Sequence, residues 1–145
     1  MKQLHLILIG ILIPLNLASC IKVSEEIHYG KDNCHWCQMK IMDPQFGAEA
    51  ITDKGRVFKF DSGECLIHYL NKTKSGHSMV LVTDYSSPKS LIDAQSAWYL
   101  ISEKVPSPMG AYLSAHASEK SARSYHVAKG GMIYSWDQVI TKLAQ

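Results

Sequence analysis

Apolar and polar residues alternate along the middle of this chain in a pattern that predicts a β-hairpin. The alternation runs weakly from Gly47 to Thr52 and clearly from Arg56 to Phe60, and the turn residues Asp53-Lys54-Gly55 separate the two runs. Two stretches with period two around a short turn that contains glycine are typical of paired antiparallel strands. The first regular structure in the chain is therefore expected between residues 47 and 60.

A helix is predicted directly after this hairpin. Asp61 or Ser62 can cap its N-terminus, and Glu64 lies in its first turn. An apolar face follows, made up of Leu66, Ile67, Tyr69 and Leu70. We expect the helix to end between residues 71 and 76 and a buried strand to cover 79–82, so the first half of the chain is predicted to be a ββαβ unit.

The second half repeats this order and adds a terminal helix. The predicted elements are strands at 97–101, 111–115 and 132–134, a helix that opens at 118 or 119 and ends at 130–131, and a helix capped by residue 135. Tyr85-Ser86-Ser87-Pro88 combines turn residues with a proline, so we place the boundary there. The prediction is an α+β fold of two small ββαβ units, 34–85 and 86–145, packed together.

Residues 1–19 are predicted to be a signal peptide. They carry one cation, Lys2, no acid, and an apolar run from Leu4 to Leu17 that Pro14 and Asn16 interrupt near its end. This run falls short of the ~20 apolar residues that a membrane-spanning helix needs. We therefore expect cleavage rather than a membrane span.

The segment Leu17-Ala18-Ser19-Cys20 resembles the lipobox of bacterial lipoproteins. That resemblance implies that Cys20 becomes the mature N-terminus and carries the lipid, which would hold the protein on the periplasmic side of a bacterial membrane through acyl chains. Ordinary cleavage that leaves Cys20 free is the alternative. Residues 20–33 are polar and of mixed charge, so we interpret them as a flexible tether.

The charge balance argues against a nucleic-acid partner. The chain has 15 basic and 13 acidic residues, and loss of Lys2 with the signal peptide leaves 14 against 13, a formal charge of +1. Proteins that bind nucleic acid usually show a strong basic excess. The chain also has no Ser-His-Asp set, paired-carboxylate motif or phosphate-binding loop, so we predict that it is not an enzyme.

The run from Cys34 to Met39 places two thiols, an imidazole and a thioether within six residues. Thiolate and thioether ligands favour Cu(I) over hard ions such as Mg²⁺. Cys34, Cys37 and Met39 are therefore the first candidate ligands. Met109 joins them because the Pro-Ser-Pro sequence before it predicts a rigid exposed corner where an apolar side chain has little other reason to lie.

The remaining histidines and methionines are weaker candidates. His35 lies inside the run and is an additional candidate ligand, and His116 follows a predicted strand after Met109. Met42, Met79 and Met132 lie on or beside predicted apolar faces. We expect these three methionines in the core, where methionine most often fills gaps.

Two other interpretations of the cysteines stay open. Cys34 and Cys37, with Cys65 and His68 two residues apart on the predicted helix, have the spacing of a Cys3His zinc site that would stabilise an interaction module. Cys65 is also compatible with a core position, since buried cysteine often acts as a small hydrophobe. Alternatively, Cys34 and Cys37 form the redox pair of a periplasmic thiol oxidoreductase. Covalent haem attachment is excluded, because Gln38 stands where a histidine would be needed.

The chain resembles the NosL family, whose members are lipid-anchored copper-binding accessory proteins for the assembly of nitrous oxide reductase. The matching segments are Cys34 to Met39, Gly55 to Ser62, Pro108 to Ala111 and Gly130-Gly131. The resemblance implies two ββαβ units. It also implies a carrier that binds one Cu(I) and delivers it to the machinery that matures the reductase, or to the reductase itself.

Carried over to this sequence, the resemblance makes Cys37 and Met39 the first ligands and Cys34 the next. It makes Met109 the ligand offered by the second half. It leaves open whether His35 or Cys65 takes part.

Overall fold

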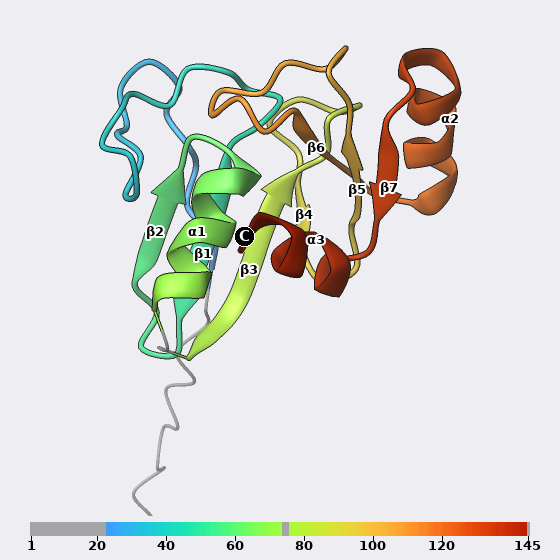
Figure 1. Cartoon of the computed structure of the whole chain (residues 1–145). Helices are drawn as coiled ribbons and strands as arrows, with labels where there is room; N and C mark the ends of the chain where they lie inside the picture. The colour runs from blue at the N-terminus through green and yellow to red at the C-terminus, as the bar shows by residue number, and fades with distance from the viewer. Residues whose placement is uncertain (1–22, 74–75, 145) are drawn as a thin grey trace, which may run out of the picture.

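The computed structural model describes residues 23–73 and 76–144 (Figure 1). The predicted signal peptide and the predicted lipid attachment at Cys20 lie outside these residues. Within the described part, none of the helices has the length and apolar character that crossing a membrane requires.

The first four strands form one antiparallel sheet with the order β2-β1-β3-β4. Its strands are β1 (Ala48–Thr52), β2 (Val57–Phe60), β3 (His77–Thr83) and β4 (Leu91–Asp93). The predicted hairpin is confirmed, since β1 pairs with β2 from Ala48 opposite Phe60 to Ile51 opposite Val57. Gly55 has a φ of 81°, the left-handed conformation that glycine adopts without strain in the connecting turn.

Helix α1 (Gly63–Lys72) follows the hairpin and lies across one face of this sheet (Figure 1). It begins where the sequence predicts, because the Ser62 hydroxyl accepts a hydrogen bond from the Cys65 N–H at 3.4 Å. The α1 helix buries Leu66 and Ile67 completely. It therefore presents the face that the apolar pattern identified.

The second sheet is also antiparallel and has the order β6-β5-β7. It consists of β5 (Trp98–Ile101), β6 (Leu113–His116) and β7 (Met132–Tyr134), and it is accompanied by α2 (Glu119–Lys129) and α3 (Trp136–Leu143). Ser118 caps α2 by accepting from the Ser121 N–H, and the Ser135 N–H donates to the Gln138 side chain at the start of α3. The predicted ββαβ order and its extra helix are present.

Strand β4 has no counterpart in the prediction. It lies beyond the predicted boundary after residue 85, yet it pairs with β3 of the first sheet, with Ile92 opposite Val82. A strand of three residues that are half-buried or exposed leaves no periodicity to detect.

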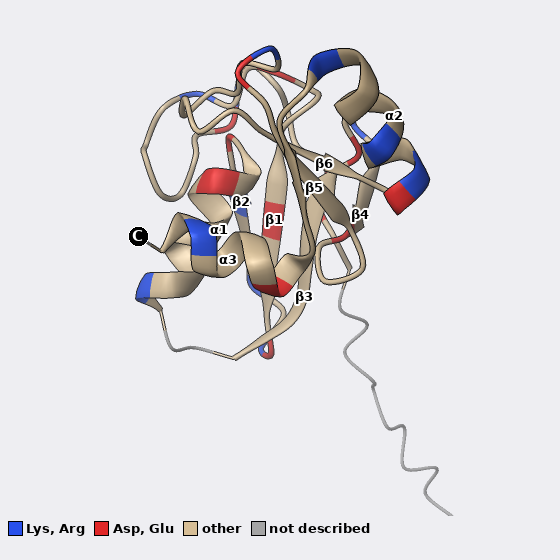
Figure 2. Cartoon of the chain, turned by 45° about the vertical axis from the view of Figure 1, so that its right-hand side comes forward, with Lys and Arg blue, Asp and Glu red and all other residues tan. Residues whose placement is uncertain are grey.

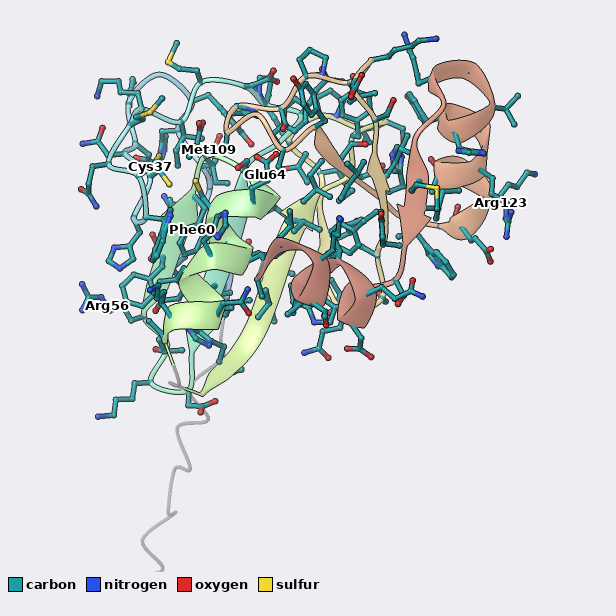
Figure 3. The ribbon with its side chains drawn as sticks, viewed as in Figure 1. Cys37, Arg56, Phe60, Glu64, Met109 and Arg123 are labelled. Carbon is teal, nitrogen blue, oxygen red and sulfur yellow. The ribbon has the colours of Figure 1, made fainter. Side chains whose placement is uncertain are left out.

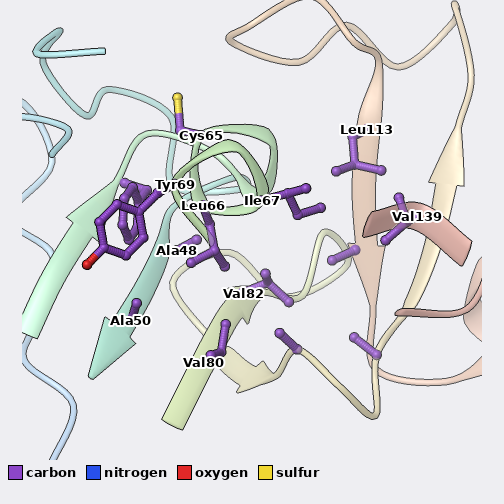
Figure 4. Close-up of a cluster of buried hydrophobic side chains, with 14 of the residues drawn as sticks. Ala48, Ala50, Cys65, Leu66, Ile67, Tyr69, Val80, Val82, Leu113 and Val139 are labelled. Atoms are coloured by element: carbon purple, nitrogen blue, oxygen red, sulfur yellow. The ribbon is translucent and has the colours of Figure 1, made fainter. Parts of the chain in front are cut away.

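The two sheets share one apolar core. Ile67 of α1 lies toward Leu113 of β6 and Val139 of α3, and all three side chains are buried (Figure 4). At about 25 cal/mol per Å² of buried apolar surface, such contacts are the main force that joins the two halves. The predicted α+β fold of two packed units is confirmed.

Residues 27–33, which we assigned to the tether, pack against the first sheet. Ile27 is buried, and a Cβ built on Gly47 would lie 2.7 Å from the Tyr29 hydroxyl oxygen and 2.9 Å from Ile27 Cδ1. The segment is held further by Lys59 Nζ, which lies 2.9 Å from the Asp32 carboxylate. The polar composition hid the two alternating apolar residues that make this contact.

Candidate metal centre

The segment from Cys34 to Met39 folds back on itself in a tight loop. The Cys34 N–H donates to the Met39 carbonyl at 2.7 Å, and the Gln38 N–H donates to the Cys34 carbonyl at 3.0 Å. Gln38 adopts a φ of 63°, which reverses the chain, and its side chain donates to the His35 carbonyl at 2.8 Å. This geometry turns both cysteines of the loop toward the same side.

Helix α1 supplies the third sulfur. The sulfur of Cys65 points away from the apolar cluster that the rest of the helix face enters (Figure 4). The Sγ atoms of Cys34, Cys37 and Cys65 all lie within 4.8 Å of one another, and none of the three forms a disulfide. Cys65 is therefore part of the thiol cluster as well as of the protein interior.

Burial makes the cluster asymmetric. Cys34 and Cys65 are fully buried, whereas Cys37 is half-buried. A metal ion held by the three sulfurs would thus be enclosed on the protein side and reachable beside Cys37. The chemistry of the donors fits a soft ion.

The three thiols differ in their affinity for protons. The Cys65 thiol donates a hydrogen bond to the sulfur of Cys34. The backbone N–H groups of Cys37, Asp61 and Trp36 also point at the Cys34 sulfur. Together these hydrogen bonds lower the pKa of Cys34 to about 5. The pKa of Cys65 is raised, because it is the donor to Cys34 and is buried. The pKa of Cys37 is raised mainly by burial. Of the three thiols, Cys34 therefore gives up its proton most readily.

Two exposed methionines lie in and just after the cysteine loop. Met39 and Met42 are 54% and 63% exposed, and they line a surface depression that Pro106, Ser107 and Pro108 close from the other side. Met109, next in this corner, is 39% exposed, and the residues just before it line the same depression as Met39 (Figure 3). The structure thus brings the predicted Met109 corner to the cysteine loop.

The prediction that Met42 and Met132 lie in the core is wrong, because each is 63% exposed. Met79 is half-buried on β3. Met42 is therefore an exposed methionine in the same depression as Met39, although the sequence pattern assigned it to the interior. Its spacing from Met39 in the same loop was the only signal that could have identified it.

Neither His35 nor His68 belongs to the group of three sulfurs. The ring of His35 packs on Phe58 with centroids 4.3 Å apart, and the ring of His68 stacks on Trp36 with centroids 6.1 Å apart. Among the described residues, the group of metal-binding atoms within 4.8 Å contains the three cysteines and no histidine. The structure therefore does not bring His68 into the Cys3His set that the spacing suggested.

His116 is buried in the second half of the molecule. Its ring nitrogens lie 3.1 Å from the Ser114 hydroxyl and 3.4 Å from the Ser121 hydroxyl, and it packs on Tyr125. Burial lowers the pKa of His116 to about 4. Its contacts are those of a satisfied core residue, and the structure does not bring it to the cysteines.

These features define a class of protein: a small α+β protein with a cluster of three thiols, two buried and one partly exposed, and with exposed methionines in and beside the cysteine loop. Comparison with known proteins identifies the family within that class. The sequence profile of the NosL family matches residues 27–144, and the chain belongs to that family. The resemblance inferred from the motifs is confirmed.

Two relatives illustrate the match. The copper-binding lipoprotein NosL of Stutzerimonas stutzeri is 29% identical over 167 residues, which cover 100% of this chain and 87% of the relative. The crystal structure of the copper chaperone NosL from Shewanella denitrificans superposes with a TM-score of 0.68 at 24% identity, over 80% of this chain and 94% of that chain. The latter similarity supports the fold. Neither name describes an enzyme.

Proposed function

We propose that this protein is a Cu(I) carrier that holds the ion between Cys34, Cys37 and Cys65 and releases it to a partner protein. The observation that carries the proposal is the cluster of three sulfurs within 4.8 Å of one another, buried on one side and open at Cys37. Thiolate sulfur is a preferred donor for Cu(I). The names of the two relatives, a copper-binding lipoprotein and a copper chaperone, support the same metal.

The surroundings of the cluster favour Cu(I) over zinc. A structural zinc site takes four ligands in a tetrahedron, usually cysteine and histidine. The described residues supply three cysteines without a histidine in the group, while exposed thioethers, which are good Cu(I) ligands and poor zinc ligands, lie nearby. Met39 and Met109 are accordingly the further ligands that we propose.

The arrangement also suits release of the ion. A partner that offers its own soft ligands can reach the metal at Cys37 and at the exposed Met39 without unfolding the protein. Cys34 and Cys65 would keep the ion until that exchange occurs. A fully enclosed site would retain the ion instead.

The finer parts of the proposal concern place and client. We propose that a lipid on Cys20 holds the protein on the periplasmic side of a bacterial membrane, which the description of the Stutzerimonas relative as a lipoprotein supports. We further propose that the copper is delivered for maturation of the copper centres of nitrous oxide reductase. Membership of the NosL family supports this client.

The direct test is an anaerobic Cu(I) titration of the full-length protein in detergent, with a competing chelator, followed by X-ray absorption spectroscopy to identify the neighbours of copper. We expect sulfur neighbours and a weaker affinity in Cys37→Ser and Met39→Leu variants. Met132→Leu is the matched control for Met39→Leu, because Met132 is also an exposed methionine, 63% against 54%, but lies on β7. Equal affinity of wild type and a Cys37→Ser/Met39→Leu double variant would refute the proposal.

A thiol oxidoreductase is the second candidate, because Cys34 and Cys37 are free thiols whose sulfurs lie within 4.8 Å of each other and Cys37 is partly exposed. The Met39→Leu variant separates the two functions. A carrier should lose Cu(I) affinity with its thiol reactivity unchanged, whereas a redox enzyme should keep both. A parallel Zn²⁺ titration tests the zinc-stabilised module, which predicts that a chelator unfolds the protein.

A further inference from the structure

Glu64 is a buried carboxylate whose hydrogen bonds all go to a distant part of the chain. It lies in the first turn of α1, one residue before Cys65, and it is fully buried. Its Oε1 atom accepts hydrogen bonds from the Ser107 hydroxyl, from the Ala111 N–H at 3.1 Å and from the Leu113 N–H at 3.4 Å. In the described part of the chain Oε2 has no partner.

These partners bracket Met109. The Gly110 N–H donates to the Ser107 carbonyl at 3.1 Å, and Gly110 has a φ of 78°, so residues 107–110 form a tight turn. Both sides of that turn are bonded to the same carboxylate oxygen, through Ser107 before Met109 and through Ala111 after it. Figure 3 shows Glu64 and Met109 at the end of the molecule where the cysteine loop lies.

Glu64 is not an ordinary capping residue of α1. An acidic side chain in the first turn of a helix can interact favourably with the helix dipole while the side chain stays in water, so the interaction does not require burial. Glu64 is instead removed from water, which is unfavourable for a carboxylate unless donors replace its hydration. The donors that replace it lie 43 to 49 positions further along the chain. The stabilisation that they provide is available only when the Met109 corner is in place.

We propose that Glu64 is a positioning residue that holds Met109 at the metal centre. Glu64 and Cys65 are consecutive residues of one helix, so a single rigid element would set the position of a cysteine ligand and of the thioether offered by the second half. The inference rests on the proposed Cu(I) function. It adds that Met109 is placed to bind the ion only when the carboxylate of Glu64 holds the turn that carries it.

A double-mutant cycle tests this coupling in the full-length protein. Loss of a residue that orients a metal ligand typically weakens metal binding by about 10- to 100-fold. We expect Glu64→Ala and Met109→Leu each to weaken Cu(I) binding by about tenfold or more. In the Met109→Leu background, Glu64→Ala should add little further loss. If Glu64→Ala weakens Cu(I) binding just as much in the Met109→Leu background, the inference is overturned, because Glu64 would then have a general structural role.

Glu49→Ala is the matched control. Glu49 is also a fully buried glutamate, but it lies on β1 opposite Lys59 and Leu81, away from the corner. This variant should leave Cu(I) affinity nearly unchanged. A loss as large as that of Glu64→Ala would contradict a specific role of Glu64.

A second measurement needs no copper and so separates this inference from the proposed function. With ¹³C-methyl methionine, the Met109 methyl resonance of the metal-free protein should move toward its unstructured position in Glu64→Ala and stay in place in Glu49→Ala. The exposed Met132 methyl is an internal reference. An unchanged Met109 resonance in Glu64→Ala overturns the inference even if the wild type binds copper. Conversely, failure of the wild type to bind Cu(I) refutes the proposed function. The shift of the Met109 methyl resonance still decides whether Glu64 positions Met109.

If Glu64→Ala fails to fold, Ser107→Ala replaces it. This change removes one of the three donors to Glu64 and leaves α1 intact. The same methyl shift and the same dependence on Met109 are expected, with smaller amplitude. Absence of both would overturn the inference.

Discussion

Replacing Glu49 by glutamine should stabilise the protein at alkaline pH and have little effect at acidic pH. Glu49 lies in the middle of the first sheet, at the acidic position of β1 in Figure 2, and it is fully buried. Within the described residues neither of its carboxylate oxygens has a hydrogen-bond partner. Burial raises the pKa of Glu49 to about 7 from its usual 4.5, although the backbone of Glu25, the charge of Lys59 and the side chain of Ser24 oppose the shift.

The size and sign of the effect follow from this shift. Between pH 4.5 and 7 the folded state keeps a proton that the unfolded state has released, so the free energy of unfolding falls as pH rises through that window. One pKa unit corresponds to about 1.4 kcal/mol, so the loss approaches roughly 3 kcal/mol above pH 7. Glutamine has the same shape and does not ionise. The stability difference between Glu49→Gln and wild type should therefore grow from near zero at pH 4.5 to about 2–3 kcal/mol at pH 8.

Urea unfolding of both proteins across this pH range, under reducing conditions, measures the difference directly. Glu103→Gln is the control, because Glu103 is exposed and its replacement should give a flat difference. A Glu49→Gln difference that does not change with pH would refute the reasoning. It would mean that solvent or an ion pair stabilises the carboxylate in the folded protein.

Three further predictions concern stability. Burial holds the pKa of His116 at about 4, so the stability that its neutral ring contributes is complete above pH 6.5 and is lost as pH falls toward 4. Urea unfolding checks this through the difference in free energy of unfolding between His116→Gln and wild type, measured as a function of pH. Gly47→Ala should displace Tyr29 and destabilise the protein by about 1–3 kcal/mol, with faster proteolysis before residue 33, whereas Gly63→Ala, whose added Cβ meets nothing closer than 3.5 Å, should not. Ile67→Ala should cost about 2–5 kcal/mol and leave a single thermal transition, while two separate transitions would show that the halves do not share a core.

Local chemistry explains why so much of the fold was predictable. The hairpin at Gly55 and the helix starts at Ser62 and Ser118 depend on neighbours a few residues away, and each was identified from the sequence. Strand β4 and the packing of Ile27 depend on partners far along the chain, and no short pattern records those partners. Long-range contacts therefore account for what the prediction of the fold missed.

The candidate site divides in the same way. Soft-ligand chemistry predicted Cys34, Cys37 and Met39 from their spacing and Met109 from its rigid corner, and the structure groups the two cysteines with Cys65. Binding by the two methionines stays a prediction. Spacing could not decide whether Cys65 faced the core or the loop. In the structure Cys65 is buried, and its sulfur lies with the other two thiols. Glu64 was recognised only as a first-turn acid, because its partners lie more than forty positions away.

The position of the centre follows from the way the two halves pack. Cys34, Cys37 and Cys65 all come from the first ββαβ unit, and the corner with Met109 comes from the second, just before β6. The core contact of Ile67 with Leu113 fixes α1 against β6, and Glu64, three residues earlier in α1, bonds the backbone N–H of the same Leu113. One apolar and one polar contact between the same two elements therefore set where the corner lies relative to Cys65. Under the proposed function, with Met109 as a ligand, the site is complete only when both halves are folded. Stable capture of Cu(I) should then depend on the packing between the units as much as on the cysteine loop itself.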